Sequence, residues 1–174
     1  MVKVDDSREF EALYRGLSPL VARTVFLVVL DRPVAQEIVH EAFSRLWQRR
    51  DQLDATSDRK SWLMRVAVNL AIDHQRGIIA ALRQRVAPAA ERDPSELALA
   101  RLDIRDMRAA LLRLPARDRA VLALRFEREL SFPEIGRILG RPEATVKTWL
   151  HRALYRLRQD LGPTNSVEFV EGNP

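Results

Sequence analysis

The sequence predicts an all-α protein, built from two small helical domains that a flexible linker joins. Apolar residues recur every three or four positions along most of the chain, and no segment shows the strict alternation of a half-buried strand. Residues 86–93 interrupt this periodicity with alanines around a proline, as a linker does. The apolar fraction of 47% provides enough side chains for packed cores on both sides of the linker.

The composition describes a basic protein without cysteine. A net charge of +5 suits a polyanionic partner. Because cysteine is absent, the sequence excludes a disulfide framework, a thiolate zinc site and a thiol nucleophile. The first ten residues carry no apolar signal core, and the longest apolar run, residues 25–30, is too short to span a bilayer. We therefore expect a cytoplasmic protein with no membrane insertion.

Four helices are expected before the linker, over residues 7–16, 20–28, 34–50 and 61–77. Ser18 and Pro19 favour the start of the second helix, because proline is tolerated in a first turn. Asp31 and Pro33 break the chain before the third helix. Residues 51–60 are polar and rich in turn-forming residues, which indicates a loop before the fourth helix.

The helices after the linker begin at residues 93–96 (DPSE), a capping sequence with proline in the first turn and Glu at its third position. Apolar residues from Leu97 to Leu114 then repeat at spacings of three and four. Pro115 ends this helix and begins another, which runs to Phe126. Residues 162–174 form a short polar tail.

Residues 131–157 read as a helix-turn-helix. Ser131 and Glu134 form a capping box, and Gly140 ends the first helix as a left-handed cap. Pro142 opens a second helix with a buried line and a basic opposite face. The buried line is Val146, Leu150, Leu154 and Leu157, and the opposite face carries Lys147, Thr148, His151, Arg152 and Arg156. A basic second helix is the geometry that reads the major groove of DNA, although a helical hairpin with a solvated charged face has the same pattern.

Two blocks of the sequence resemble those of one family. The first contains AQEIVHEAFSRLW (residues 35–47) and WLMRVAVNLAIDHQR (62–76), which are similar to the family patterns AEDLVQEAFLRLW and WLxRVAxNLAxDxxR. The second, residues 114–158, follows the pattern LPxxxRxVLxLRxxxxLSxxEIAxxLGxPxGTVKSRLHRAxxRLR. The chain therefore resembles the extracytoplasmic-function (ECF) sigma factors, the small two-domain group of the sigma-70 family, over nearly its whole length.

The resemblance implies a division into sigma region 2 over residues 7–84, a linker over 85–94, sigma region 4 over 95–161 and a tail over 162–174. Region 2 would bind core RNA polymerase and recognise and melt the minus-ten element of promoter DNA. Region 4 would read the minus-thirty-five element through its helix-turn-helix. We expect the two domains to sit independently unless a partner clamps them. The family usually implies an anti-sigma factor that masks both DNA-binding domains.

The resemblance also implies that the helix over residues 34–50 docks on the coiled coil of the largest polymerase subunit. The outward-facing residues are Glu37, His40, Glu41, Ser44 and Gln48. An acidic and amide row on a basic protein suits a basic partner helix, and the alternative is an ordinary solvated helix face. His40 stands where the family usually has glutamine, a departure that could alter the polymerase contact.

The minus-ten element is expected to bind the loop over residues 51–60 and the helix after it, with a flipped base held in a pocket. The candidate residues are Lys60, Trp62, Arg65, Asn69 and Arg76. Trp62 is the only aromatic residue between positions 54 and 76, which predicts weak melting and a demand for a close promoter match; the same residue could instead belong to the core. Asp73 is expected to pair with Arg76 or Arg65, because a carboxylate repels phosphates.

The candidate residues for the minus-thirty-five element are Arg141, Thr145, Lys147, Thr148, Trp149, Arg152 and Arg156. Arg141 and Arg156 are expected to contact phosphates, which position the helix without reading sequence. Lys147 should reach base edges, and Arg152 either a base or a phosphate. Ala144 and Trp149 stand where the family has glycine and commonly arginine, and the indole in place of a charged donor predicts a changed promoter preference.

Two functions of other classes are alternatives to this one. A one-component helix-turn-helix regulator would need a ligand pocket or a symmetric interface within residues 10–77, where the sequence has an acidic face and a polar loop instead. An enzyme would need a catalytic constellation, but the sequence shows no Ser/His/Asp, metal-ligand or Gly-rich phosphate motif. The sequence therefore predicts no catalytic site, no metal and no cofactor.

Overall fold

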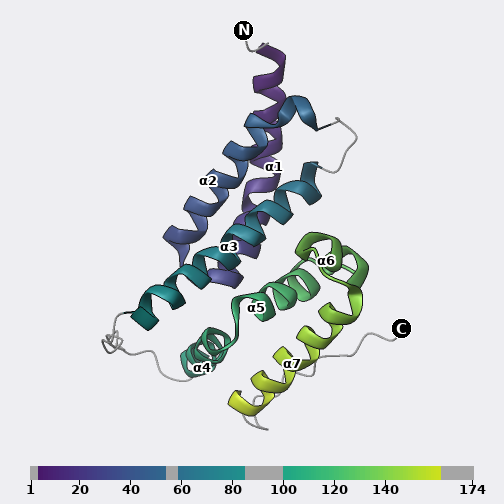
Figure 1. The fold of residues 1–174 in the computed structure, drawn as a ribbon. Helices are drawn as coiled ribbons and strands as arrows, with labels where there is room; N and C mark the ends of the chain where they lie inside the picture. Colours follow the sequence, from purple (N-terminus) through teal and green to yellow (C-terminus); the bar gives the residue numbers. More distant parts are fainter. Residues whose placement is uncertain (1–3, 54–58, 85–99, 162–174) are drawn as a thin grey trace.

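The computed structural model describes residues 4–53, 59–84 and 100–161, and this part of the chain is helical apart from short turns, without a strand (Figure 1). It contains the α-helices α1 (Val4–Val29), α2 (Arg32–Gln48), α3 (Arg59–Gln84), α4 (Ala100–Arg113), α5 (Ala116–Leu122), α6 (Phe132–Leu139) and α7 (Glu143–Leu161). A 3₁₀ turn, Arg50–Gln52, follows α2, and a π-helical turn, Ala123–Glu127, follows α5. The predicted all-α fold is confirmed.

Helices α1, α2 and α3 pack against one another as the N-terminal bundle (Figure 1). Asp31 caps the start of α2, because its carboxylate accepts a hydrogen bond of 3.1 Å from the backbone N–H of Val34. The side chains that fill the core come from all three helices and include Val21, Val25, Ile38, Phe43, Leu46, Leu63 and Val68. The apolar stripes predicted for this half of the chain therefore meet in one core.

The predicted break at Pro19 is wrong, because α1 is one continuous helix. Proline inside a helix removes a hydrogen bond and costs on the order of 3 kcal/mol. Pro19 is exposed, however, and Val21 and Val25 continue the buried face that Leu17 begins on the other side of the proline. Packing of this face against α2 and α3 keeps the helix continuous.

By length and composition alone, the Ser7–Val29 stretch of α1 could cross a membrane. In the structure its Val21 and Val25 are almost fully buried, and the helix packs against α2 and α3. The hydroxyl of Thr24, which is also buried, donates a hydrogen bond of 3.0 Å to the carbonyl of Leu20. The core helix of a soluble protein passes the same test of length and composition, so this one helix is weak evidence for a membrane span.

Helices α4 to α7 form the C-terminal bundle. Pro115 separates α4 from α5, as predicted. The buried residues of this bundle include Leu114, Val121, Leu124, Ile135, Val146, Leu150 and Leu157. The predicted linker and the predicted start of a helix at residues 93–96 lie outside the described residues, as does the tail over 162–174.

Helices α6 and α7 form the predicted helix-turn-helix. The carboxylate of Glu134 accepts a hydrogen bond of 2.8 Å from the backbone N–H of Ser131, which completes the capping box. Gly140 ends α6 with a φ of +61°, a conformation that a side chain disfavours. The backbone N–H of Arg141 donates to the carbonyl of Gly136 at 2.9 Å and closes the turn. The local signals in the sequence are therefore confirmed here.

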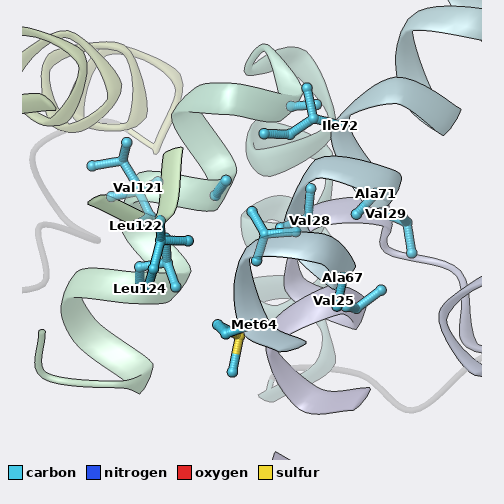
Figure 2. Packing of buried hydrophobic residues seen from close by; sticks show 14 of the residues in the cluster. Val25, Val28, Val29, Met64, Ala67, Ala71, Ile72, Val121, Leu122 and Leu124 are labelled. Atoms are coloured by element: carbon cyan, nitrogen blue, oxygen red, sulfur yellow. The ribbon is translucent and has the colours of Figure 1, made fainter. Parts of the chain in front are cut away.

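The two bundles pack against each other, with α1 and α3 on one side and α5 and α6 on the other (Figure 1). Figure 2 shows Val28, Met64 and Ile72 of the N-terminal bundle across from Val121 and Leu122 of α5, and all are buried. The sequence predicts domains that sit independently, whereas the structure has one core cluster that continues from one bundle into the other. The apolar residues that periodicity assigns to separate cores are also the residues of this contact, which periodicity alone does not reveal.

Candidate functional site

The open face of the helix-turn-helix lies along the first turns of α7. Lys147 and Thr148 are exposed there, on the side opposite the buried Val146 and Leu150. The ammonium of Lys147 forms a 2.7 Å ion pair with Glu143, one turn earlier. An exposed pair of this kind contributes only about 0–1 kcal/mol, so Lys147 can exchange this carboxylate for another acceptor.

The other residues of the predicted reading helix are less open. Trp149 is half-buried and packs against the core, and the guanidinium of Arg117 lies 5.3 Å from its ring centroid. Thr145 is also half-buried. The hydroxyl of Thr148 donates a hydrogen bond of 2.9 Å to the carbonyl of Ala144. The indole is therefore not on the same open surface as Lys147.

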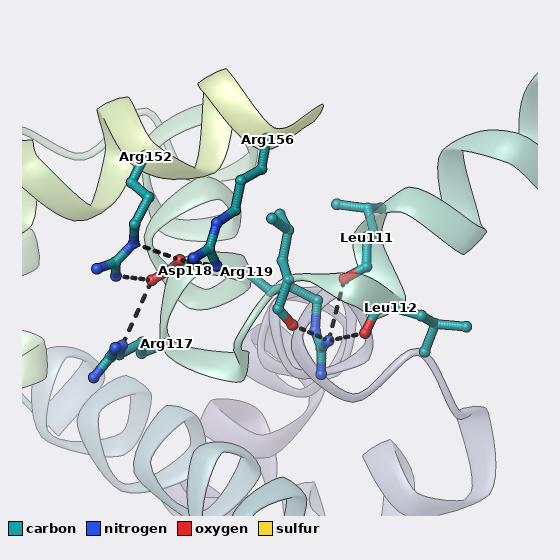
Figure 3. Close-up of polar contacts among 8 residues, drawn as sticks. Leu111, Leu112, Arg117, Asp118, Arg119, Arg152 and Arg156 are labelled. Atoms are coloured by element: carbon teal, nitrogen blue, oxygen red, sulfur yellow. Dashed lines mark hydrogen bonds and ion pairs between the residues drawn. The ribbon is translucent and has the colours of Figure 1, made fainter. Parts of the chain in front are cut away.

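Arg152 is fixed to a buried carboxylate on another helix. Its Nε and Nη2 donate hydrogen bonds of 3.2 and 2.7 Å to the two oxygens of Asp118 on α5, and Asp118 has no exposed surface (Figure 3). The hydrogen bonds to Asp118 raise the pKa of Arg152. Arg117 and Arg156 also approach Asp118, at 3.7 and 3.9 Å. Asp118 thus forms ion pairs with three arginines and links α7 to α5.

The remaining cations of the helix-turn-helix are on the surface. Arg141, in the turn, and Arg156, near the end of α7, are exposed. The exposed line of α7 continues from Lys147 through His151 and Tyr155, which were not among the predicted site residues. Their spacing of four residues from one another is the signal that could have found them.

On α3, the predicted minus-ten residues Lys60, Arg65, Asn69 and Arg76 are all exposed. Arg76 lies 3.4 Å from Asp73, which confirms one of the two pairings expected for that carboxylate. Trp62 is half-buried and packs against the core, so the alternative core assignment describes its position.

A small cavity of about 70 Å³ lies beside the start of α3. It is lined by Glu9, Phe10, Leu13, Leu46, Trp47, Arg50, Asp51 and Arg59. Arg59 forms a 2.9 Å ion pair with Glu9, and the guanidinium of Arg50 lies 4.3 Å from the ring centroid of Trp47. The cavity therefore combines aromatic faces with hydrogen-bond donors.

The predicted polymerase face on α2 is fully open. Its five residues, Glu37, His40, Glu41, Ser44 and Gln48, are all exposed. Arg45 pairs with Glu41 at 2.7 Å. A groove of about 440 Å³ runs beside this face between α1 and α2, and it is lined by Ser7, Phe10, Tyr14, His40, Phe43, Ser44 and Trp47. The polar row therefore borders an aromatic groove.

Two buried charged residues in the C-terminal bundle, Asp118 and Arg119, were not among the predicted site residues. Asp118 follows the buried Leu114 by four residues and precedes the buried Val121 by three, which is the spacing of a core position. A charged residue at a core position must have charged or polar partners. This conflict between residue type and spacing is the signal that was available in the sequence.

The sequence matches the family described as Sigma-70 region 2 over residues 13–78 and the family described as Sigma-70, region 4 over residues 104–157. The chain is 34% identical to the ECF RNA polymerase sigma factor SigL of Mycobacterium tuberculosis over 88% of its own length and 90% of the relative's. It is 33% identical to SigW of Bacillus subtilis, over 73% and 75% of the two chains. SigX of the same organism is 29% identical, over 87% and 83%.

Several solved structures share this fold. One is the sigma factor RpoE in complex with the anti-sigma factor NepR from Bartonella quintana, with a TM-score of 0.69 and 20% identity over 88% of this chain and 97% of the other. The second is CnrH in complex with the cytosolic domain of CnrY, with a TM-score of 0.66 and 22% identity over 89% and 88%. Together with the two matched families and the similarity to SigL, these findings show that the chain belongs to the ECF sigma factors of the sigma-70 family.

Proposed function

We propose that this ECF sigma factor binds core RNA polymerase through α2, opens the minus-ten element with the end of the N-terminal bundle at α3, and reads the minus-thirty-five element with α7. It works in the cytoplasm and acts by binding, without catalysing a reaction itself. The observation that carries this proposal is the presence of separate open surfaces of different chemistry: a carboxylate and amide row on α2, and basic faces on α3 and α7. A one-component regulator has no need of the first surface.

The α2 surface suits a helical, basic partner such as the coiled coil of the largest polymerase subunit. Glu37 and Glu41 lie one turn apart on the same face and provide the negative charge. The aromatic groove beside His40 and Ser44 provides apolar surface for the same partner. Charge sets the orientation of such a complex, and burial of the rings supplies affinity.

The minus-ten surface suits a single DNA strand. Lys60, Arg65 and Arg76 supply cations along α3, which match the phosphates of the strand. The cavity between Trp47, Arg50 and Arg59 offers a stacking face and guanidinium donors, the groups that hold an unstacked base. Because Trp62 packs against the core, it contributes little stacking surface, which supports the expectation of weak melting.

On the minus-thirty-five surface, Lys147 and Thr148 lie on the open, N-terminal part of α7, the part that reaches base edges in a helix-turn-helix. Arg141 in the turn and Arg156 near the end of the helix flank them and suit phosphates. We assign Arg152 a positioning role instead of a base contact, because its guanidinium is committed to Asp118.

An anti-sigma factor is the proposed regulator. Two of the solved structures with this fold hold a sigma factor with the anti-sigma factor NepR and CnrH with the cytosolic domain of CnrY. Such a partner would mask the surfaces of α2, α3 and α7. Co-purification with the chain from the native cell would identify this anti-sigma factor.

Run-off transcription tests the proposed function. Core polymerase from the native organism is incubated with genomic promoter fragments, with and without the full chain. Specific transcripts are expected only when the chain is present, and they should be lost with the double variant K147A/R141A. The matched control R15A/R105A removes two exposed arginines outside all three surfaces and should leave transcription unchanged. If core polymerase with the chain makes no transcript that core polymerase alone does not make, the proposal is wrong.

A further inference from the structure

Helix α1 ends inside the contact between the two bundles. The last carbonyls of a helix have no partner within the helix and must find one elsewhere. Leu30 follows α1 with a φ of +57°, so the chain turns sharply there. The carbonyls of Val28 and Leu30 accept hydrogen bonds from the side chains of Arg119 and Arg108, which belong to the C-terminal bundle, at 2.6 and 2.9 Å. The end of α1 is therefore capped by the other bundle.

Arg119 is the centre of this contact. Its side chain is buried, and its guanidinium donates to both bundles at once. Figure 3 shows its contacts with the carbonyls of Leu111 and Leu112 in the C-terminal bundle. From the C-terminal bundle it contacts the carbonyls of Leu111, at 3.2 Å, and Leu114, at 2.8 Å. From the N-terminal bundle it contacts, besides Val28, the side-chain oxygen of Gln75 on α3, at 3.2 Å. A buried guanidinium needs all of these acceptors, and separation of the bundles would remove two of them.

Contacts at the rim support the same closed arrangement. Arg23 on α1 forms a 2.7 Å ion pair with Glu127 in the π-helical turn of the C-terminal bundle. Within the N-terminal bundle, the amide nitrogen of Gln75 donates a hydrogen bond of 3.4 Å to the carbonyl of Val29, which leaves the amide oxygen of Gln75 for Arg119. We call this cluster of contacts the latch; it consists of Arg119, Arg108, Gln75, Arg23 and Glu127.

The closed arrangement does not allow both promoter elements to be bound together. The two elements lie about 25 base pairs apart, which is roughly 85 Å at about 3.4 Å for each pair. The whole of α7, with 19 residues, is only about 28 Å long, and α5 and α6 of its bundle pack directly on α1 and α3. To reach both elements, the bundles must separate. The α2 surface, in contrast, is open in the closed arrangement.

We infer that the latch holds the free protein in a closed, autoinhibited state, in which polymerase can dock on α2 but the promoter cannot be bound at both elements until the latch opens. This inference rests on the proposed function. The proposed regulation needs no second protein, because both halves of the latch belong to this chain. The apparent affinity for promoter DNA is then reduced in proportion to the closed fraction.

The test compares variants of the full chain in which the latch is weakened or restored. R23E/R108A places Glu against Glu127 and removes the cap of Leu30, and R23E/E127R restores the rim ion pair with its charges exchanged. R15E is the matched control, because Arg15 is exposed on α1 and pairs within that helix, with Glu11. All of these changes except E127R are at exposed residues, so each bundle should keep its helicity.

Closure is measured by fluorescence energy transfer between dyes on cysteines introduced at the exposed Ala12 and Gln159, and the absence of native cysteine makes this labelling specific. Transfer should fall in R23E/R108A and stay at the wild-type level in R23E/E127R and R15E. In run-off transcription, the half-maximal concentration of R23E/R108A should be about two- to ten-fold lower than that of the wild type.

Three results of these measurements would contradict the proposal. Unchanged transfer in R23E/R108A would show that these contacts do not hold the bundles together. Reduced transfer without a lower half-maximal concentration would show that closure is not inhibitory. A wild-type chain that supports no transcription would overturn the proposed function and autoinhibition with it, while the transfer measurement would still report whether the latch closes the protein.

Discussion

Arg152 on α7 donates two hydrogen bonds to Asp118 on α5, so the helix that carries the open basic face is tied to the bundle by a fully buried carboxylate. The geometry uses both nitrogens on one side of the guanidinium and both oxygens of the carboxylate, which defines direction as well as distance. The position of Lys147, just over one turn earlier on α7, therefore depends on a contact with the buried Asp118.

Asp118→Asn should destabilise the protein by roughly 3 kcal/mol, because it leaves Arg152 and its neighbouring cations around a buried group without charge. Urea unfolding followed by circular dichroism measures this change. Asp73→Asn is the control, since Asp73 is exposed and its ion pair with Arg76 contributes at most about 1 kcal/mol. Equal, small effects of the two substitutions would contradict the anchoring role of Asp118.

Lys147→Ala should cost about 1–3 kcal/mol in binding to the preferred minus-thirty-five sequence and much less on other sequences, the usual worth of a base-edge contact. Arg156→Ala should weaken all sequences by a similar amount, because a phosphate contact reads no sequence. Binding of the full chain to a randomised duplex library at two salt concentrations separates the two effects. Parallel shifts for both variants would mean that α7 does not read bases at Lys147.

Reversal of two charges on α2, E37K/E41K, should weaken binding to core polymerase at least ten-fold in a pull-down titration, because both carboxylates lie on the proposed docking face. E11K/D106K changes the net charge by the same amount at exposed positions elsewhere and should bind as the wild type does. Circular dichroism should show the same helicity for both. Retention of full affinity by E37K/E41K would remove this face from the proposal.

Gly140→Ala should destabilise the helix-turn-helix by about 1–2 kcal/mol, since the residue has a φ of +61°. An added Cβ would meet no atom within 4 Å there, so backbone strain is the whole effect. Gly77→Ala is the matched control within α3, where the added Cβ is also free and alanine should stabilise the helix by about 0.5–1 kcal/mol. Thermal unfolding of the two variants should move in opposite directions.

The elements that the sequence predicts correctly are those whose cause is local. Ser131 and Glu134 form their capping box within one turn, and Gly140 needs only its own φ. The helix break expected at Pro19 does not occur, because packing against α2 and α3 offsets the hydrogen bond that the proline removes. The local sequence reveals the lost hydrogen bond but not this packing. Local rules therefore identify the ends of helices better than they identify their continuity.

The contacts of Arg119 and Arg152 could not be predicted in this way. Arg152 lies 34 residues from Asp118, and Arg119 lies 44 residues from Gln75. Both arginines carry the same charge as Lys147 and Arg156, so residue type does not distinguish a cation that holds the fold together from one on an open surface. The open residues of α2 and α3 were predicted by spacing, because spacing decides which face of a helix points away from the core.

The capping of α1 by the C-terminal bundle has a consequence for synthesis of the chain. The carbonyl of Val28 accepts its hydrogen bond from Arg119, which is synthesised 91 residues later. The carbonyl of Leu30 accepts from Arg108, which is synthesised 78 residues later. At about 5–20 residues per second, the ribosome needs roughly 5–20 s to add the 91 residues that separate the first pair. During this interval the N-terminal bundle can fold on the ribosome, but the carbonyls of Val28 and Leu30 lack the two arginine donors. The end of α1 is thus the last part of that bundle to become fully ordered, and it does so when the second half of the protein arrives.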